Sequence, residues 1–173
     1  MRDLLYAPWR HSYVTGKESV HDRTGLRADG CVFCQQFAES EDGKHFILRR
    51  FSRCAVMLNR YPYNPGHVMI LPFAHKPELH DLEADVRSEM MEVLSLSMPV
   101  IQKAINCQGF NVGINLGLAG GGGIPSHLHI HVLPRWQGDT NFLELINNTK
   151  VISSQLEQTF ADLQPGFAAL VQP

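Results

Sequence analysis

The sequence predicts an α+β domain built on an antiparallel sheet of about five strands, with a long helix against one face and a C-terminal helix. Three observations support this prediction. Apolar segments of strand length are separated by turn-forming residues, a central stretch repeats its apolar residues with helical spacing, and a histidine-rich segment alternates in polarity. The chain has 173 residues, of which 44% are hydrophobic, so one domain can bury a sizeable core.

The beginning of the chain differs from the rest. Residues 1–30 join an aromatic and basic opening to a polar stretch without periodicity, which predicts an N-terminal arm. Residues 31–173 show no internal repeat and no compositional break, which predicts a single domain.

The expected strands are short apolar segments. A loop rich in Asn, Tyr, Pro and Gly at 59–66 separates the second from the third, so these two strands should form a hairpin. The expected strands are 45–48, 55–58, 67–71, 109–115 and 127–133, and Pro134 should end the last of them.

Two helices are expected. Between Leu82 and Asn106, apolar residues recur at spacings of three, four or seven, which is typical of an amphipathic helix. Pro99 should kink or break this helix, because proline lacks the backbone N–H. A second apolar pattern predicts a C-terminal helix over 151–163.

Three histidines alternate with apolar residues in 127–133, His-Leu-His-Ile-His-Val-Leu. Strand parity places His127, His129 and His131 on one face, where imidazoles can attack, exchange protons or bind metal near neutral pH. Four consecutive glycines come shortly before them, and glycine-rich backbone can hold phosphate oxygens. This neighbourhood favours phosphoryl chemistry with His129 as the nucleophile, and a catalytic metal bound by the triad stays open as an alternative.

Residues 127–133 match the motif His-φ-His-φ-His-φ-φ, where φ is apolar, and on this match the chain resembles the histidine triad (HIT) family. Segments 58–62 and 65–72 are similar to the hairpin of that family. Segment 134–142 resembles the branch that contains diadenosine polyphosphate hydrolases and phosphorylases, and the resemblance covers about residues 31–145. It implies a HIT-like fold and a homodimer.

The resemblance also implies an activity, the cleavage of a dinucleoside polyphosphate such as diadenosine tetraphosphate at its α-phosphorus. His129 would form a nucleotidyl-histidine that water or phosphate then resolves, and His131, His67 and His127 complete the expected catalytic set. A phosphorylase or a nucleotidyl-amine hydrolase would use the same nucleophile. A nucleotide-binding module without catalysis is the rival from another class.

The resemblance extends to a set of substrate-binding residues. They are Asn59 at the ribose, Gly121, Gly122, Gly123 and Ser126 at the phosphates, and Asn115. One departure concerns Gly123 and Ile124, which stand where family members often carry a Gln or a Ser/Thr. Phosphate contacts from side chains are lost there, and the choice between hydrolase and phosphorylase stays open.

Cys31 and Cys34 form a pair with two-residue spacing, which fits half of a zinc site, a redox pair or two buried thiols beside Phe33. In bacterial relatives a similar pair joins a histidine after the Pro-Gly-His strand and the first triad histidine. The resemblance thus implies a structural zinc on Cys31, Cys34, His75 and His127, which would make His127 a ligand instead of a catalytic residue. A divalent cation that accompanies the polyphosphate is a second cofactor, which the sequence leaves open.

Composition narrows the partners. The net charge of -2 gives no excess of cations for holding long nucleic acids by counterion release, so a small nucleotide is the expected ligand. The sequence contains no apolar run of about 18 residues, which predicts no membrane span. Four cysteines are too few for a disulfide scaffold, and the charged N-terminus lacks a signal core, so we expect reduced thiols and a cytoplasmic location.

Overall fold

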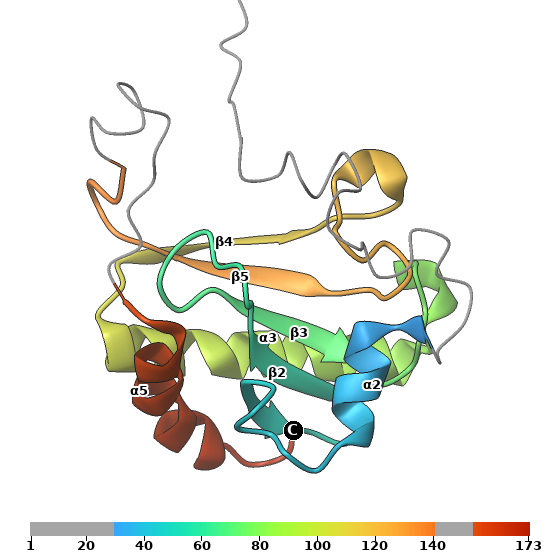
Figure 1. The fold of residues 1–173 in the computed structure, drawn as a ribbon, viewed down its shortest axis with the longest axis horizontal. Coiled ribbons are helices and arrows are strands. Elements are labelled where there is room, and N and C mark those ends of the chain that lie inside the picture. Colours follow the sequence, from blue (N-terminus) through green and yellow to red (C-terminus); the bar gives the residue numbers. More distant parts are fainter. Residues whose placement is uncertain (1–29, 141–153) are drawn as a thin grey trace, which may run out of the picture.

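The computed structural model describes residues 30–140 and 154–173, which form an antiparallel sheet with helices on both faces (Figure 1). Across the sheet the strands are β1 (Ile47–Arg50), β2 (Cys54–Leu58), β3 (Val68–Pro72), β5 (Ile130–Arg135) and β4 (Gly109–Ile114). The helices are α2 (Val32–Ala38), α3 (Ala84–Ile105) and α5 (Leu156–Ala168), with 3₁₀ turns η3 (Leu79–Asp81) and η4 (Leu118–Gly120). The predicted α+β class, with about five antiparallel strands, a long helix and a C-terminal helix, is confirmed.

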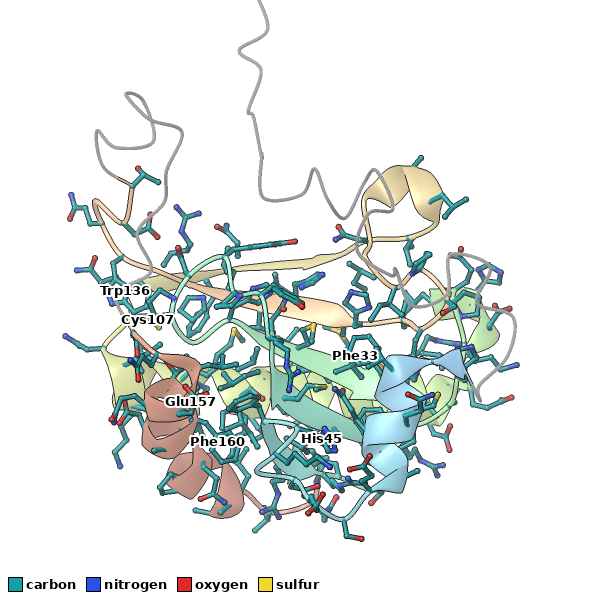
Figure 2. All side chains as sticks on the ribbon, viewed as in Figure 1. Phe33, His45, Cys107, Trp136, Glu157 and Phe160 are labelled. Atoms are coloured by element: carbon teal, nitrogen blue, oxygen red, sulfur yellow. The ribbon has the colours of Figure 1, made fainter. Side chains whose placement is uncertain are left out.

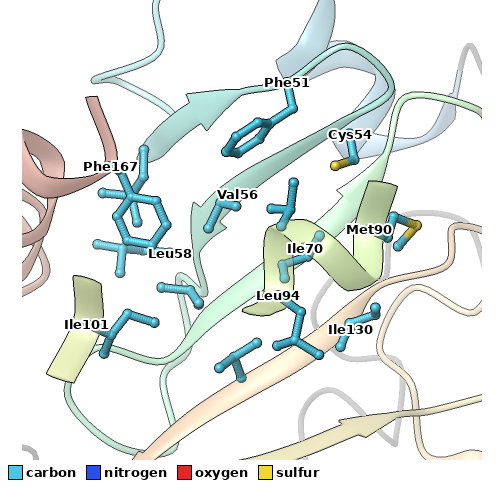
Figure 3. Packing of buried hydrophobic residues seen from close by; sticks show 14 of the residues in the cluster. Phe51, Cys54, Val56, Leu58, Ile70, Met90, Leu94, Ile101, Ile130 and Phe167 are labelled. Carbon is cyan, nitrogen blue, oxygen red and sulfur yellow. The ribbon is translucent and has the colours of Figure 1, made fainter. Parts of the chain in front are cut away.

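The larger part of the core lies between the sheet and the pair α3 and α5 (Figure 3). Alternate residues of the strands point to this face, among them Val56, Ile70 and Ile130, and they meet Met90 and Ile101 of α3. All five are at most 2% exposed. Fully burying a side chain of this size contributes about 1.5–3 kcal/mol, so this face supplies most of the driving force for folding.

The opposite face of the sheet carries a smaller apolar cluster together with histidines. Met57 of β2 and Met69 of β3 pack with Phe33, which α2 directs toward the sheet. Met69 lies opposite His131 in the ladder between β3 and β5. The short helix α2 therefore covers part of the same face on which the histidines stand.

The first strand differs from the prediction at its start. It begins at Ile47 instead of His45, because Phe46 has a φ of 56°, a left-handed conformation that does not continue a strand. The helix α2 is absent from the predicted elements. It has only seven residues and one buried side chain, Phe33, so it leaves no periodic signal in the sequence.

The last strand is displaced from its predicted bounds, since it runs from Ile130 to Arg135 and includes Pro134. The prediction that Pro134 ends the strand is wrong. Pairing with β3 stops at Val132, and the Pro134 carbonyl accepts a hydrogen bond from the Asn64 side chain instead of a neighbouring strand. The missing N–H therefore faces the side of β5 that has no ladder at this position.

Helix α3 runs through Pro99 without a break. The carbonyl that loses its hydrogen bond belongs to Ser95, and both residues are exposed, so water can satisfy that carbonyl. Helix α5 begins at Leu156, later than predicted, and continues past 163 to Ala168. Residues 151–153 lie outside the described residues, as does the predicted arm except for Gly30.

Helices α3 and α5 approach each other closely at Gly166. A Cβ atom at that position would lie 2.7 Å from Val100 Cγ1, so only glycine fits without a shift. Within the described ranges, no helix is both long and apolar enough to cross a membrane.

Candidate active site and metal cluster

The histidine row stands on the face of the sheet opposite α3. Leu128, Ile130 and Val132 point into the core beneath α3, so the residues between them face the other way. The rings of His129 and His131 are neighbours, with centroids 4.7 Å apart. The strand parity predicted for the row is therefore observed, although His127 and His129 precede the first hydrogen-bonded residue of β5.

The local contacts of His129 fix which ring nitrogen carries the proton. Nδ1 lies 2.8 Å from the backbone oxygen of His127, and a carbonyl can only accept, so Nδ1–H donates. The lone pair of the neutral ring is therefore on Nε2. His129 is 5% exposed, and burial lowers its pKa below the ordinary value, which keeps the ring neutral near pH 7. A neutral, oriented imidazole of this kind can act as a nucleophile.

Aromatic packing fixes the plane of this ring. Phe33, on the side of α2 that faces the sheet (Figure 2), lies with its ring centroid 5.7 Å from that of His129 and 5.5 Å from that of His127. Both contacts are tilted or edge-on, the geometry that aromatic pairs favour. Through Phe33, helix α2 therefore contacts two members of the row.

His67, which directly precedes β3, connects to the other end of the row. The backbone N–H of Tyr63 donates to His67 Nδ1 at 3.2 Å, so the proton of neutral His67 is on Nε2. Nε2 donates in turn to His131 Nδ1 at 3.0 Å, which leaves the proton of His131 on Nε2. Burial and then the neighbouring His131 and His129 lower the pKa of His67 to about 3, which excludes a charged ring near neutral pH.

The ring nitrogens of His127 are directed at a backbone carbonyl and at two cysteines, which is not the orientation of a substrate-binding side chain. Its Nε2–H donates to the Pro72 carbonyl at 2.8 Å, and its Nδ1 points at the sulfur atoms of Cys31 and Cys34, both 3.5 Å away. The side chain is fully buried, and burial lowers its pKa to about 4. Nε2 is thus committed to a hydrogen bond, and the Nδ1 lone pair, which faces the two sulfur atoms, is available for a metal.

Cys31, Cys34, His75 and His127 bring four ligand atoms within 4.8 Å of one another and can hold a metal ion. Zinc with bonds of about 2.3 Å to sulfur and about 2.05 Å to nitrogen would place S and N about 3.6 Å apart and two N atoms about 3.3 Å apart. The measured S–N distances are 3.4 to 3.5 Å, and the two Nδ1 atoms of His75 and His127 are 3.4 Å apart. These S–N and N–N distances therefore match those of a tetrahedral zinc site.

The raised pKa of Cys34 bears on how a metal could bind, because a protonated thiol must first lose its proton. Burial and the neighbouring Cys31 raise the pKa of Cys34 to about 11. Thiolates are the form that binds metal, so binding at neutral pH must release thiol protons. The other two cysteines, Cys54 and Cys107, are buried in the apolar cluster beneath α3.

Two of the expected substrate residues, Asn115 and Gly122, lie at the His131 end of the row. Asn115 follows β4, and its side-chain Nδ2 lies 3.4 Å from His131 Nε2. An amide NH₂ group only donates, so the proton assigned to His131 Nε2 requires the Asn115 amide to turn its Oδ1 toward that nitrogen. Gly122 packs on Asn115, with room for a Cβ only at van der Waals contact, and Gly121 has a φ of 79° that favours glycine. Asn59 forms a turn through the Tyr61 N–H.

Ser126, expected at the phosphates, is 6% exposed. Its hydroxyl oxygen is buried without a hydrogen-bond partner among the described residues, so a ligand oxygen or a water would satisfy it. Gly123 belongs to the same loop.

Three contributors were not identified as site residues from the sequence. Tyr63 supplies the N–H that sets the His67 proton, Pro72 supplies the carbonyl for His127, and Asn64 anchors the hairpin loop to the end of β5. Backbone groups carry no sequence signal. Asn64 stands in a segment that the resemblance covers, but its contacts to residues 70 and 75 positions away have no local pattern.

Comparison with known proteins assigns the family. Residues 40–138 match the HIT domain. The AP-4-A phosphorylase of Mycobacterium tuberculosis is 36% identical over 155 residues, which are 90% of this chain and 79% of that protein. The asymmetrical bis(5'-nucleosyl)-tetraphosphatase of Schizosaccharomyces pombe is 27% identical over 117 residues, 68% of this chain and 60% of that protein.

Solved structures share the fold. A zinc-bound histidine triad family protein from Mycobacterium smegmatis superimposes with a TM-score of 0.67 at 22% identity, covering 82% of this chain and 96% of that chain. A histidine triad nucleotide-binding protein from Sulfolobus tokodaii gives 0.63 at 24%, covering 79% and 89%. The predicted HIT-like fold and the resemblance to HIT-family enzymes are confirmed, and the chain belongs to the HIT family.

Proposed function

We propose that this protein cleaves dinucleoside polyphosphates, with diadenosine tetraphosphate as the test substrate, at the α-phosphorus through a nucleotidyl-histidine at His129. The observation that carries the proposal is the hydrogen bond from His129 Nδ1–H to the His127 carbonyl. It leaves the Nε2 lone pair of a neutral imidazole free to attack. The names of the two enzymes compared above, a phosphorylase and a tetraphosphatase, support this substrate class.

The proposed reaction has two displacements. His129 Nε2 attacks the α-phosphorus, a P–N bond forms, and the P–O bond to the leaving polyphosphate breaks, so that the leaving oxygen takes the negative charge. The second acceptor, phosphate or water, then attacks the same phosphorus and the P–N bond breaks, which restores the neutral imidazole. Phosphate yields a nucleoside diphosphate, and water yields a nucleoside monophosphate. The relative at 36% identity favours phosphate as the acceptor.

Other members of the row would hold the substrate. His131 carries its proton on Nε2, beside Asn115, and we propose that this N–H donates to a phosphoryl oxygen. The hydrogen bond from His67 Nε2 to His131 Nδ1 would keep that proton on His131 Nε2. The loop at Gly121 to Ser126 would bind phosphate oxygens through its amides and the buried Ser126 hydroxyl, and Asn59 would contact the ribose.

We also propose that Cys31, Cys34, His75 and His127 hold a structural zinc. The support is the agreement between the measured S–N and N–N distances and tetrahedral zinc. His127 would then be a ligand, and its part in the reaction would be limited to the carbonyl that orients His129. A divalent cation bound with the polyphosphate remains a further proposal, tested by the dependence of turnover on added Mg²⁺.

The test compares wild type and His129→Asn on diadenosine tetraphosphate, with and without phosphate, with products separated by chromatography. We expect turnover by the wild type and a loss of about 10⁴-fold or more in the variant, because the nucleophile is removed. His80→Asn is the matched control, since the His80 side chain is 82% exposed and should leave turnover unchanged. Equal turnover by His129→Asn and wild type would exclude His129 as the nucleophile.

Three rival functions give other results. If the triad held a catalytic metal, His129→Asn would lose zinc along with activity, whereas the proposal expects it to retain zinc as measured by elemental analysis. A binding module would bind the nucleotide tightly without turnover by the wild type. Turnover of adenosine phosphoramidate, but not of diadenosine tetraphosphate, would indicate a nucleotidyl-amine hydrolase.

We propose that the protein forms a homodimer and resides in the cytoplasm. The edge strand β4 supports the first proposal, because Val112 on it is 45% exposed and Leu116 and Leu118 just beyond it are 42% and 76% exposed. The second is supported by the cluster of Cys31, Cys34, His75 and His127, because metal binding there would need reduced thiols. Light scattering, with Val112→Glu as the variant, tests the dimer.

A further inference from the structure

A polar network of one buried and two partly buried side chains, Asn64, Asp139 and Arg135, lies at the end of β5. Asn64 is 2% exposed, and its Nδ2 donates one hydrogen bond to the Pro134 carbonyl at 2.9 Å and another to Asp139 Oδ2 at 3.0 Å. Arg135 holds the same carboxylate from the other side, with Nη2 2.8 Å from Oδ1. Hydrogen bonds from Arg135 lower the pKa of Asp139 well below its ordinary value, so the carboxylate is a permanent acceptor.

Asn64 connects this network to the hairpin loop between β2 and β3. Its own carbonyl accepts from the His67 N–H at 3.2 Å, so Asn64 lies within the turn that ends at His67. The preceding residue, Tyr63, donates its N–H to His67 Nδ1 and lies with its ring centroid 4.8 Å from that of His67. The same ring stacks on His131 at 6.1 Å. A shift of Asn64 would therefore move the groups that contact both histidines.

In this network, the donor of each hydrogen bond determines where the next ring carries its proton. Since the Tyr63 N–H can only donate, it requires an unprotonated Nδ1 on His67, which in turn places protons on Nε2 of both His67 and His131. Without the Tyr63 contact, His67 could carry its proton on Nδ1. His67 Nε2 would then be an acceptor that faces His131 Nδ1. The proton of His131 could move to Nδ1 and would no longer be fixed on Nε2.

We propose that Asn64 and Asp139 are positioning residues that hold Tyr63 against His67 and thereby keep the protons of His67 and His131 on Nε2. Neither residue contacts the reacting atoms in this account. The catalytic consequence rests on the proposed function, in which the His131 Nε2–H donates to a phosphoryl oxygen. The tautomer itself is a property of the protein without substrate.

The test combines a spectroscopic readout with kinetics in Asn64→Ala and the milder Asp139→Asn. Long-range ¹H–¹⁵N NMR distinguishes protonated from unprotonated ring nitrogens, and a His67→Gln spectrum assigns the His67 signals. We expect an unprotonated Nδ1 on His67 in the wild type and a protonated or averaged Nδ1 in both variants. For diadenosine tetraphosphate we expect kcat to fall about tenfold or more with KM changed less, because a bound substrate meets a misplaced donor.

The matched control is Asp42→Asn. Asp42 also pairs with an arginine, Arg50, at 2.8 Å, in an ion pair that is partly exposed. Arg50 stands on β1, which β2 and β3 separate from β5. This variant should leave the histidine signals and kcat as in the wild type. If Asn64→Ala fails to fold, Asp139→Asn decides, because it keeps the shape of the side chain.

The outcomes separate the two proposals. Wild-type ring signals in both variants would overturn the positioning role, whether or not kcat falls, and altered signals with kcat within about twofold of wild type would overturn its catalytic part. If the wild type does not cleave diadenosine tetraphosphate, the proposed function fails on that substrate, while the ring signals still decide the role of Asn64 and Asp139.

Discussion

The two faces of the central sheet are both buried over much of their area, but they bury different chemistry. Beneath α3 the strands present Val56, Ile70 and Ile130, which need only apolar neighbours. On the other face His67, His127 and His129 are at most 5% exposed, and each uses a ring nitrogen in a specific hydrogen bond. Buried polar groups that lose a partner are costly, so the second face tolerates fewer arrangements than the first.

This difference explains how the sheet can support both stability and chemistry. The apolar face fixes the strands, and the fixed strands hold imidazoles whose tautomers are then set by carbonyls and amides. His129 and His127 show the dependence most clearly, because the carbonyl of one orients the ring of the other. We therefore expect changes of metal or pH to act on the polar face, and changes of side-chain volume to act on the apolar face.

The largest expected effect is the loss of the metal cluster in Cys34→Ser. We expect bound zinc to fall from about one per chain to none, and the free energy of unfolding to fall by about 4 kcal/mol where free zinc exceeds its Kd about 1,000-fold. Elemental analysis and denaturant unfolding measure these quantities. Cys107→Ser, a buried thiol of the apolar face, is the control that should keep its zinc. Retained zinc in Cys34→Ser would refute the ligand set.

A smaller effect is expected from acid. The pKa of His67 is lowered to about 3 in the fold, whereas an unfolded histidine has a pKa near 6.5, so the unfolded chain binds more protons between these values. Stability is therefore lost as pH falls from about 6.5 toward 3. Between about pH 6.5 and 4.5 the single group contributes about 2 kcal/mol to this loss.

His67→Gln should remove that contribution, because glutamine does not titrate. The difference between wild type and variant in unfolding free energy, measured at several pH values, isolates His67 from other acid-sensitive groups. An identical pH dependence in both proteins would show that His67 titrates normally in the folded state.

The smallest expected effect belongs to the apolar face. Gly166→Ala would place a Cβ 2.7 Å from Val100 Cγ1, so α3 and α5 must separate slightly, at a cost of about 1–2 kcal/mol. Turnover should not change, because the histidines lie on the opposite side of the sheet. Thermal unfolding and a turnover assay test this, and Gly43→Ala, where a Cβ meets nothing within 4 Å, is the control. A change in turnover would contradict the separation of the two faces.

The apolar and the polar features of the molecule also differ in how well the sequence predicted them. Periodicity predicted α3 and the face of the histidine row, because repeated apolar burial leaves a regular pattern. It did not predict α2, which is too short for a period, or the extension of β5 through Pro134, which depends on where β3 begins. The metal ligands followed from resemblance, since local spacing could not join Cys34 to His75 and His127.

Asn64 and Asp139 are an example of a contact that could not be predicted from the sequence. They are 75 positions apart, and the hydrogen bond between them arises only once the hairpin loop lies against the end of β5. Phe46 is similar on a smaller scale, because its left-handed conformation shortens a strand that its apolar character favours. Polar contacts and backbone turns of this kind depend on the assembled fold.

The proposed covalent nucleotidyl-histidine can be observed by intact-mass spectrometry of protein quenched during turnover of diadenosine tetraphosphate. The quench must avoid acid, because a P–N bond to histidine hydrolyses there. We expect an adduct of one nucleoside monophosphate in the wild type, mapped to His129, and none in His129→Asn. An adduct on a different residue, or turnover by His129→Asn at the wild-type rate, would contradict it.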